Sequence, residues 1–356
     1  SAWKKLLAAP AGGAGLDVDE VFSTYLYTGT GNDVAKVNGI DLAGEGGMVW
    51  TKGRSFGSAS HALYDTERGL NFASGTKAGK LNSSLDTDER QGVLSAFNSN
   101  GFTENAGLNQ DIVSWTWRKA PKFFDIVTYT GNGSSITINH NLESTVGSIW
   151  IKCRSDSKQW SVYHRSSDYA SNGLLFLNSV SASPGYASST AYQGKLSSIN
   201  SSSFVVTKGA EADNVNTNGE TYVAYIFAHN DGDGEFGPDS DQDIIKCGDY
   251  TGNGSTTGPV INLGFEPQWL LIKNSSADAN WELVDNMRDF RSPKINVGLF
   301  ALNPNLSDAE AEGRAYGATS TGFSIVDDHA DVNASNNKYI YMAIRRGPLA
   351  PPEAGT

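Results

Sequence analysis

The stretch Val113-Ser114-Trp115-Thr116-Trp117 decides the fold class, because large apolar residues occupy every second position. Successive side chains of a β-strand point to opposite faces, so this spacing places the apolar residues on one face of a strand. Two further stretches alternate in the same way, at Val223-Ala224-Tyr225-Ile226-Phe227 and at Ile340-Tyr341-Met342-Ala343-Ile344. The residues between the apolar ones are mostly small or aromatic, which favours a central strand covered on both faces.

Each of these strands closes a repeat that opens with one turn motif. The motif is Tyr27-Thr28-Gly29-Thr30-Gly31 in the first copy, Tyr129-Thr130-Gly131-Asn132-Gly133 in the second and Tyr250-Thr251-Gly252-Asn253-Gly254 in the third. A strand followed by glycine-rich polar residues favours a tight turn with positive φ over a phosphate-binding loop, which would need a helix after it. Repeated markers in a fixed order predict tandem units of one fold.

Two further markers lie inside each repeat. An apolar stretch ends in lysine at positions 52, 152 and 273, and a ring residue follows at positions 61, 160 and 281. A ligand contact is one interpretation of the lysines. The simpler one is a charge that protects a strand end from aggregation.

The repeats predict an all-β protein of three tandem β-sandwich, jelly-roll-like domains with short extensions at both ends. Each domain is long enough to hold its own core. The expected segments are an N-terminal attachment segment at 1–21, repeats at 22–120, 124–228 and 245–347, an acidic linker at 229–244 and a C-terminal tail at 348–356.

Composition limits the classes of partner. The chain has 27 Lys and Arg against 39 Asp and Glu, for a net charge of −12, which argues against nucleic acid. No run of 18 apolar residues occurs, so we expect no membrane insertion. Cys153 and Cys247 are too few for a disulfide framework and favour free thiols made in a reducing cytoplasm.

Acidic residues supply the candidates for chemistry. Asp65 and Glu67 have the spacing of a glycosidase pair along a strand, but the adjacent Arg68 favours a surface ion pair. We therefore predict no catalytic residues and no cofactor. The acidic linker lacks the turn glycine of an EF-hand, so we expect an exposed hinge with no essential metal. A looser calcium site would use residues of this linker, namely Asp231, Asp233, Asp239, Asp241 and Asp243.

The N-terminal segment carries the candidates for docking. Trp3, Leu6 and Leu7 form an apolar cluster that Ala, Gly and Pro residues separate from the first repeat. An apolar cluster that is set apart from the first core is expected to bury itself against a neighbouring subunit or another protein. A frayed terminus is the alternative interpretation.

Long strings in this chain resemble a repetitive protein family encoded by tailed phages of marine bacteria and cyanobacteria. The strings are Val21–Gly29, His61–Gly69, Ala96–Phe102, Ser114–Pro121, Tyr250–Gly254, Pro267–Lys273 and Ala343–Pro348. The family is similar to tail-fibre and other virion surface proteins, and no catalytic residues are attached to it.

The resemblance implies a non-enzymatic virion structural protein that is made in the host cytoplasm. We expect it on the particle surface, on the tail or a short tail fibre rather than the capsid, with a role in host attachment. The expected partners are other virion proteins, further copies in a homo-oligomer such as a trimer, and a host-surface glycan. The alternatives are a capsid decoration protein and a carbohydrate-binding or polysaccharide-degrading enzyme.

Overall fold

The structure is a computed structural model that describes residues 15–55, 57, 60–70, 79–167, 173–182, 194–209, 214–291 and 299–347. Antiparallel strands dominate these residues, which confirms the all-β sandwich class. The helices found there are one turn each: α1 (Val18–Val21), α2 (Leu42–Glu45) and the 3-10 helix η1 (Asn286–Arg288).

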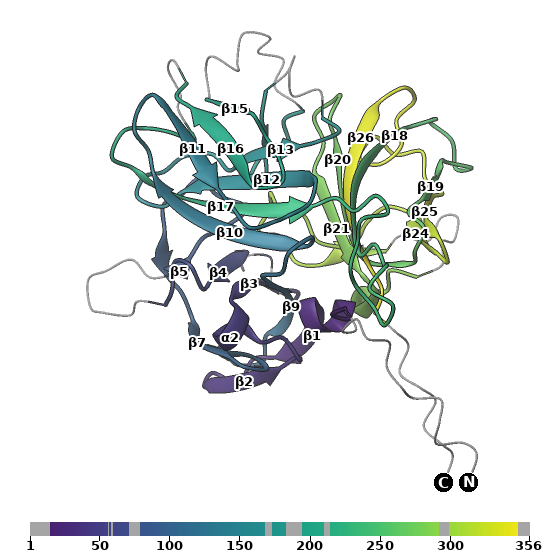
Figure 1. Cartoon of the computed structure of the whole chain (residues 1–356). Helices are drawn as coiled ribbons and strands as arrows, with labels where there is room; N and C mark the ends of the chain where they lie inside the picture. Colours follow the sequence, from purple (N-terminus) through teal and green to yellow (C-terminus); the bar gives the residue numbers. More distant parts are fainter. Residues whose placement is uncertain are drawn as a thin grey trace, which may run out of the picture.

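One arrangement of strands recurs three times, and we call the three copies units 1, 2 and 3 (Figure 1). Each unit has a larger inner sheet and a three-stranded outer sheet, and the two sheets enclose the sandwich interior. The inner sheets have the orders β1-β9-β3-β4, β10-β17-β12-β13-β14 and β18-β26-β20-β21. The outer sheets have the orders β2-β8-β7, β11-β16-β15 and β19-β25-β24.

The strands have the following bounds. Unit 1 holds β1 (Phe22–Thr28), β2 (Asp33–Val37), β3 (Gly47–Gly53), β4 (Ala62–Asp65), β5 (Gly79–Lys80), β6 (Arg90–Gln91), β7 (Leu94–Asn98), β8 (Gly101–Asn105) and β9 (Asp111–Arg118). Unit 2 holds β10 (Phe124–Thr130), β11 (Ser135–Asn139), β12 (Val146–Cys153), β13 (Ser161–His164), β14 (Leu175–Phe176), β15 (Lys195–Ser197), β16 (Ser203–Thr207) and β17 (Thr221–Ala228). Unit 3 holds β18 (Ile245–Thr251), β19 (Val260–Asn262), β20 (Pro267–Asn274), β21 (Trp281–Asp285), β22 (Phe300–Ala301), β23 (Ala311–Glu312), β24 (Tyr316–Thr319), β25 (Gly322–Ile325) and β26 (Lys338–Arg345).

The three alternating stretches are the central strands of the inner sheets. β9 pairs with β1 and β3, β17 with β10 and β12, and β26 with β18 and β20. One face of each central strand points into its own sandwich and the other points toward the neighbouring units. The prediction of equivalent, central closing strands is confirmed.

The repeated turn motif needs glycine at two positions for two different reasons. In unit 2, a Cβ on Gly131 would lie 2.2 Å from the backbone oxygen of Thr217, so only glycine allows this close approach. The later Gly133 has φ 68°, and its counterparts Gly31 and Gly254 have φ 71° and 65°. These left-handed conformations favour glycine, which confirms the prediction of a tight turn with positive φ.

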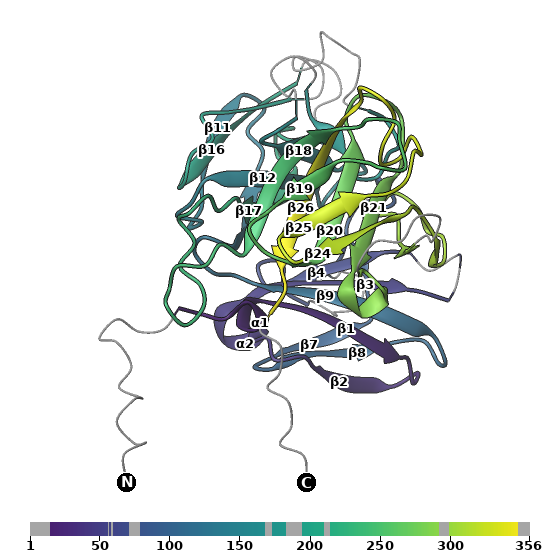
Figure 2. The ribbon, with the colours of Figure 1, turned by 90° about the vertical axis from the view of Figure 1, so that its right-hand side faces the viewer.

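The inner sheets of all three units share one central core, which the expectation of one core in each domain did not include. The ring centroids of Trp50 in unit 1 and Trp150 in unit 2 lie 5.8 Å apart, and those of Trp117 in unit 1 and Trp269 in unit 3 lie 5.6 Å apart. Figures 1 and 2 show the three units packed around this centre rather than strung in a row. Smaller separate cores fill the sandwiches of units 1 and 3.

The acidic segment between units 2 and 3 is not the exposed linker that its composition predicts. Phe236 is 3% exposed, and its ring lies 6.3 Å from that of Phe123. Asn230 is fully buried and accepts hydrogen bonds from the backbone N–H groups of Ile244 and Ile245 at 3.0 and 3.2 Å. One buried ring and one buried amide therefore hold the segment against both units, although most of its acids are exposed.

Candidate functional site

The places where the units meet form a closed ring of three joints. At the joint between units 1 and 2, Tyr225 donates its hydroxyl to Asp65 Oδ2 at 2.7 Å. At the joint between units 3 and 1, Trp115 Nε1 donates to Asp285 Oδ2 at 2.8 Å. Asp65 and Asp285 end equivalent strands, β4 and β21. The same position therefore makes the same kind of contact to a different neighbour.

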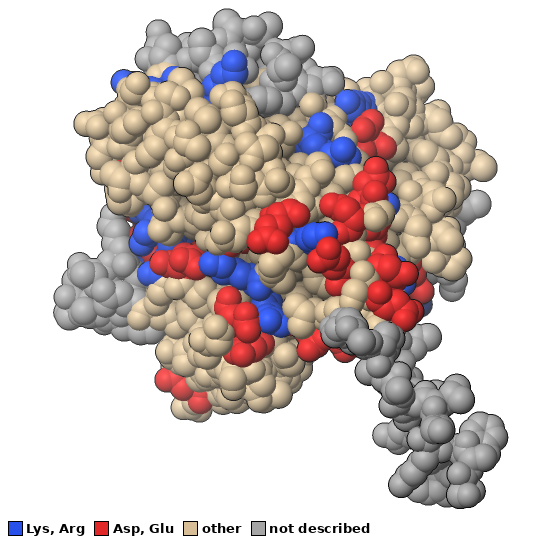
Figure 3. Space-filling view, viewed as in Figure 1, with Lys and Arg blue, Asp and Glu red and all other residues tan. Residues whose placement is uncertain are grey.

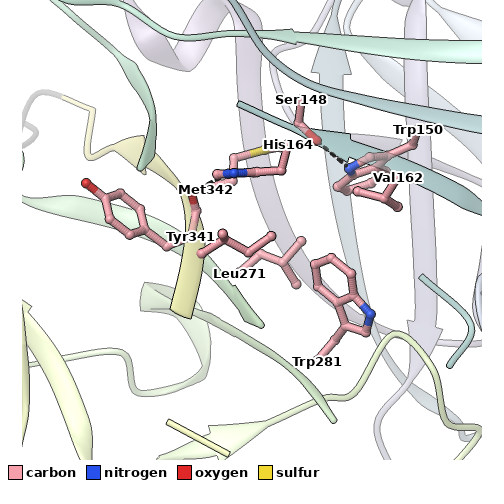
Figure 4. Close-up of a pocket in the computed structure, with 9 residues that line it drawn as sticks. Ser148, Trp150, Val162, His164, Leu271, Trp281, Tyr341 and Met342 are labelled. Carbon is pink, nitrogen blue, oxygen red and sulfur yellow. Dashed lines mark hydrogen bonds between the residues drawn. The ribbon is translucent and has the colours of Figure 1, made fainter. Parts of the chain in front are cut away.

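The third joint uses a histidine in place of the aspartate. His164 ends β13, and its Nε2 lies 3.0 Å from the backbone oxygen of Tyr341 in unit 3. Its Nδ1 accepts a hydrogen bond from the backbone N–H of Ser166, so Nε2 carries the proton and donates. Figure 4 shows His164 and Tyr341 among the residues that line a cavity of about 10 Å³, together with Trp281. A cavity of this size holds at most about one water molecule.

The aspartates of the other two joints are locked in buried ion pairs. Arg68 Nε binds Asp65, and Arg288 Nε binds Asp285 at 2.7 Å, with all four side chains fully buried. The interpretation of Asp65 and Arg68 as a surface ion pair is therefore wrong. Glu67 binds Lys119 at 2.5 Å in an exposed contact, so Asp65 and Glu67 occupy different environments.

Each ion pair extends to a glutamate and then to the next unit. Glu89 binds both Arg68 of its own unit, at 3.2 Å, and Arg154 of unit 2, at 2.9 Å. Glu310 binds Arg54 of unit 1 at 2.5 Å and lies 3.6 Å from Arg288. Sequence reasoning missed these glutamates, because they lie in irregular segments outside the repeated markers.

The three repeated lysines also connect neighbouring units. Lys52 of unit 1 donates to the backbone oxygens of Ser307 and Asp308 in unit 3, at 3.2 and 2.7 Å. Lys152 donates to the backbone oxygen of Asp86 in unit 1 at 3.2 Å, and Lys273 donates to the backbone oxygen of Val180 in unit 2 at 2.7 Å.

All three lysines are at most 1% exposed, so the interpretation as charges that protect strand ends is wrong. Burial lowers the pKa of Lys52 and Lys152 to about 8 and that of Lys273 to about 7. Backbone oxygens supply the hydrogen bonds that a buried ammonium group needs.

The repeated ring residues follow the same order around the ring. His61 Nε2 lies 3.1 Å from the backbone oxygen of Asn303 in unit 3. Trp160 Nε1 donates to Asn82 of unit 1 at 2.8 Å, and Trp281 Nε1 donates to Phe176 of unit 2 at 2.9 Å. Two sets of markers that the sequence repeats are therefore contacts between units.

Trp115 and Trp117 are fully buried in the central core. Their burial confirms the prediction that this stretch is a central strand covered on both faces.

The acids proposed for a loose calcium site bind protein groups or face outward. Asp243 accepts from the backbone N–H groups of Gly232 and Gly234, and Asp233 accepts from the Ser144 hydroxyl at 3.1 Å. Asp231 lies 4.0 Å from Lys246, whereas Asp239 and Asp241 are exposed. Within the described ranges, no group of three or more His, Cys, Asp or Glu residues could hold a metal ion.

The predicted docking residues Trp3, Leu6 and Leu7 lie outside the described residues. Val18, near the beginning of the described chain, lies close to its last described residue: a Cβ on Gly347 would lie 3.3 Å from Val18 Cγ1.

Charged residues on the face shown in Figure 3 gather along the seams between the units. Lys119 lies between Glu67 and Asp125 at the seam of units 1 and 2, at 2.5 and 3.4 Å. Lys122 and Glu235 form a 2.6 Å pair at the seam with the acidic segment. Broad surfaces away from the seams carry few charges on this face (Figure 3).

Unit 1 contains a polar hollow at one end of its sandwich, with a volume of about 170 Å³. The carboxylate of Glu104 and the side chains of Thr51, Tyr64, Lys80 and Gln110 line it. Glu104 is 2% exposed, and burial raises its pKa. Buried groups with shifted pKa values in a concave site mark a candidate binding site.

Comparison with known proteins adds a family but no activity. No curated protein matches the chain. In the part of the chain that the structure describes, no helix is long and apolar enough to cross a membrane. Residues 17–348 match the family described as "Domain of unknown function (DUF7483)", and because this match spans nearly the whole chain, the protein belongs to that family.

Proposed function

We propose that the protein is a non-enzymatic structural protein of a phage particle, on the tail or a short tail fibre, with a role in host attachment. The observation that supports it best is the closed ring of joints. Buried lysines, ion pairs and ring N–H groups connect every unit to both of the others. Such a body keeps its shape without a hinge between units, as a part exposed on a particle requires.

The resemblance of the repeated strings to phage virion proteins supports the same proposal. The expected partners are other virion proteins and further copies of this chain, with a trimer as the first state to test. A capsid decoration protein would need the same rigid body. Only the position in the particle separates the two functions.

Purified particles of the phage that encodes the chain provide the test. Mass spectrometry of gradient-purified particles should find the chain at a fixed ratio to the major capsid protein. Gold-labelled antibodies should then mark the tail. Label on the capsid would indicate the decoration protein instead, and absence of the chain from particles would contradict both.

The N-terminal segment is the proposed attachment peptide, through Trp3, Leu6 and Leu7. A chain without residues 1–14 keeps every described residue, so it should melt at the same temperature and yet be missing from particles. A matched variant with Trp3, Leu6 and Leu7 all changed to Ser keeps the length of the segment and should also be missing. Normal incorporation of both variants would show that attachment uses another surface.

A function in carbohydrate binding is the second candidate, and the polar hollow of unit 1 favours it. Polysaccharide degradation has less support, because Asp65 is fixed by Arg68 and Tyr225 inside a joint. Incubation with host envelope polysaccharide should release no reducing sugar. Release that survives the change Asp65→Asn would indicate an active site elsewhere.

A further inference from the structure

Units 2 and 3 share a pair of stacked tyrosines that unit 1 lacks. In both units the tyrosine of the turn motif lies directly opposite a tyrosine of the central strand. The rings stack at 5.0 Å with an interplanar angle of 10° in each pair. The pairs are Tyr129 with Tyr222 and Tyr250 with Tyr339.

In unit 1 the residue opposite Tyr27 is Ile112. The hydroxyl groups of Tyr222 and Tyr339 each accept a backbone N–H from the preceding loop, from Thr217 and Ala334 at 2.9 and 2.7 Å. Isoleucine has neither the ring nor the hydroxyl. Unit 1 therefore lacks the side chain that fills this end of the sandwich in the other units, and Ile112 lines the hollow instead.

A second change enlarges the same place. The backbone N–H of the last glycine of each turn motif donates to a backbone oxygen in a later loop. That oxygen belongs to Asn216 in unit 2, to Asn333 in unit 3 and to Ala106 in unit 1. The asparagine side chains donate to Ser134 and Ser255 across the turn, at 3.1 and 2.8 Å. Alanine cannot do so, and Ala106 lines the hollow.

A third change adds a charge. The residue two positions after the phenylalanine of β8, β16 and β25 is Glu104 in unit 1, Val206 in unit 2 and Ile325 in unit 3. The Tyr27 hydroxyl donates to Glu104, whereas the equivalent Tyr250 donates to a backbone oxygen. Glu104 also accepts a hydrogen bond from the Thr51 hydroxyl. A carboxylate has about four acceptor positions, so these two bonds leave Glu104 able to accept another.

We propose that this hollow in unit 1 is a binding site for one sugar ring, with Glu104 accepting a hydrogen bond from a sugar hydroxyl. The hollow is open because unit 1 has Ile112 where units 2 and 3 have a tyrosine ring. Its lining suits a polyol, because the amide of Gln110 and the ammonium group of Lys80 offer both donors and acceptors. Val93 and Ile112 add apolar groups to the same lining.

The same lining disfavours an aromatic ligand. An aromatic ring satisfies at most one or two polar groups, and the remaining ones would lose water without gaining a partner. A sugar carries hydroxyls around its whole edge and can meet groups on several sides. The site extends the proposed role in host attachment to a chemical class of partner, but binding to the isolated protein does not depend on that role.

Saturation-transfer NMR with the full chain tests the site. The probes are glucose, galactose, mannose and N-acetylglucosamine, each at millimolar concentration, with phenol as the aromatic competitor. At least one sugar should receive saturation. No transfer to any of the four sugars would overturn the proposal, and transfer to phenol alone would show an aromatic site in its place.

Two variants place the binding in the hollow. Ile112→Tyr restores the ring found in units 2 and 3 and should weaken sugar binding by roughly tenfold or more, which corresponds to about 1.4 kcal/mol. Glu104→Gln keeps the shape and removes the charged acceptor, so it should also weaken binding. Val260→Tyr adds the same ring at an exposed position of unit 3 and should change nothing.

Melting temperatures of the variants separate loss of the site from loss of the fold. Full sugar binding by a folded Ile112→Tyr protein would overturn the proposal. If that variant does not fold, Glu104→Gln decides, and unchanged binding by it would overturn the proposal equally. Because the experiment uses purified protein, its failure leaves the particle experiments unaffected.

Discussion

The joint between units 2 and 3 differs in chemistry from the other two joints. Asp65 and Asp285 are charged, and each has an arginine three residues later as a buried partner. His164 has the same position, but it meets its neighbour as a neutral ring that donates to the backbone oxygen of Tyr341. Equivalent geometry can therefore be stabilised by an ion pair or by a neutral hydrogen bond. What the position requires is a short polar side chain that reaches the next unit.

Formation of the two ionic joints requires the desolvation of charged side chains, whereas formation of the neutral joint does not. Moving an aspartate and an arginine out of water is unfavourable, and close pairing offsets that cost only when every remaining polar atom has a partner. Arg68 meets this condition through Glu89, Leu63, Gly79 and Tyr225. The loss of either charge should therefore be more damaging than the loss of a neutral contact.

The largest effect should come from the core that all three joints surround. Trp117→Ala removes a ring that contacts Phe227 of unit 2 and Trp269 of unit 3. We expect a loss at the upper end of about 3–5 kcal/mol in the free energy of unfolding. Guanidinium unfolding measures it, with Phe300→Ala as the exposed control. A loss below about 1 kcal/mol would show that the units do not depend on the shared core.

Removal of one charge from an ionic joint should cause the second-largest loss in the free energy of unfolding. Arg288→Met leaves Asp285 charged and buried, so we expect a loss of about 3–5 kcal/mol. The double variant Arg288→Met with Asp285→Asn should recover part of it, since no lone charge remains. Arg291→Met removes the exposed pair with Asp289 and should cost less than about 1 kcal/mol. Equal losses for Arg288→Met and Arg291→Met would show that burial of the ion pair does not affect its contribution to stability.

The histidine of the neutral joint should make folding sensitive to acid. Burial lowers the pKa of His164 to about 3, whereas an unfolded histidine titrates near about 6.5. Below about pH 6.5 the unfolded chain binds a proton at this residue that the folded chain does not. Stability therefore falls as the pH decreases toward about 3, by up to about 1.4 kcal/mol per pH unit.

Unfolding curves between pH 7 and pH 4 would measure this slope. His164→Gln keeps a neutral donor and should reduce the slope. Because burial also lowers the pKa values of His61, His140 and His229, part of the slope should remain in His164→Gln. An identical slope in His164→Gln and the parent would refute the assignment.

A lysine contact between units should contribute least. Lys152→Met leaves the backbone oxygens of Asp86, Cys153 and Lys158 without this donor. We expect a loss of about 1–3 kcal/mol, partly offset because a buried charge is also removed. Lys195→Met, on the exposed part of β15, is the matched control. A gain in stability would mean that the desolvation of Lys152 outweighs its hydrogen bonds.

Local pattern predicted the units but not their contacts. The alternation in 113–117 and its two copies predicted central strands, because a period of two follows from the geometry of any strand. The turn glycines were predictable for the same reason, since positive φ is a local property. The hollow of unit 1 was not predictable. Its defining residues, Ile112 and Glu104, are ordinary strand residues, and they stand out only when equivalent strand positions of the three units are compared.

The sequence by itself determined the all-β class, the three repeats and their central strands, since these depend on spacing within a few residues. Only the tertiary structure decided that the repeats form a ring with one core. It placed Lys52 beside a backbone oxygen 256 residues away, and it turned an acidic segment into an anchored connection through Phe236. The physical reason is that burial and pairing depend on which surfaces meet. The local periodicity of a sequence does not predict which distant carbonyl oxygen a lysine will contact.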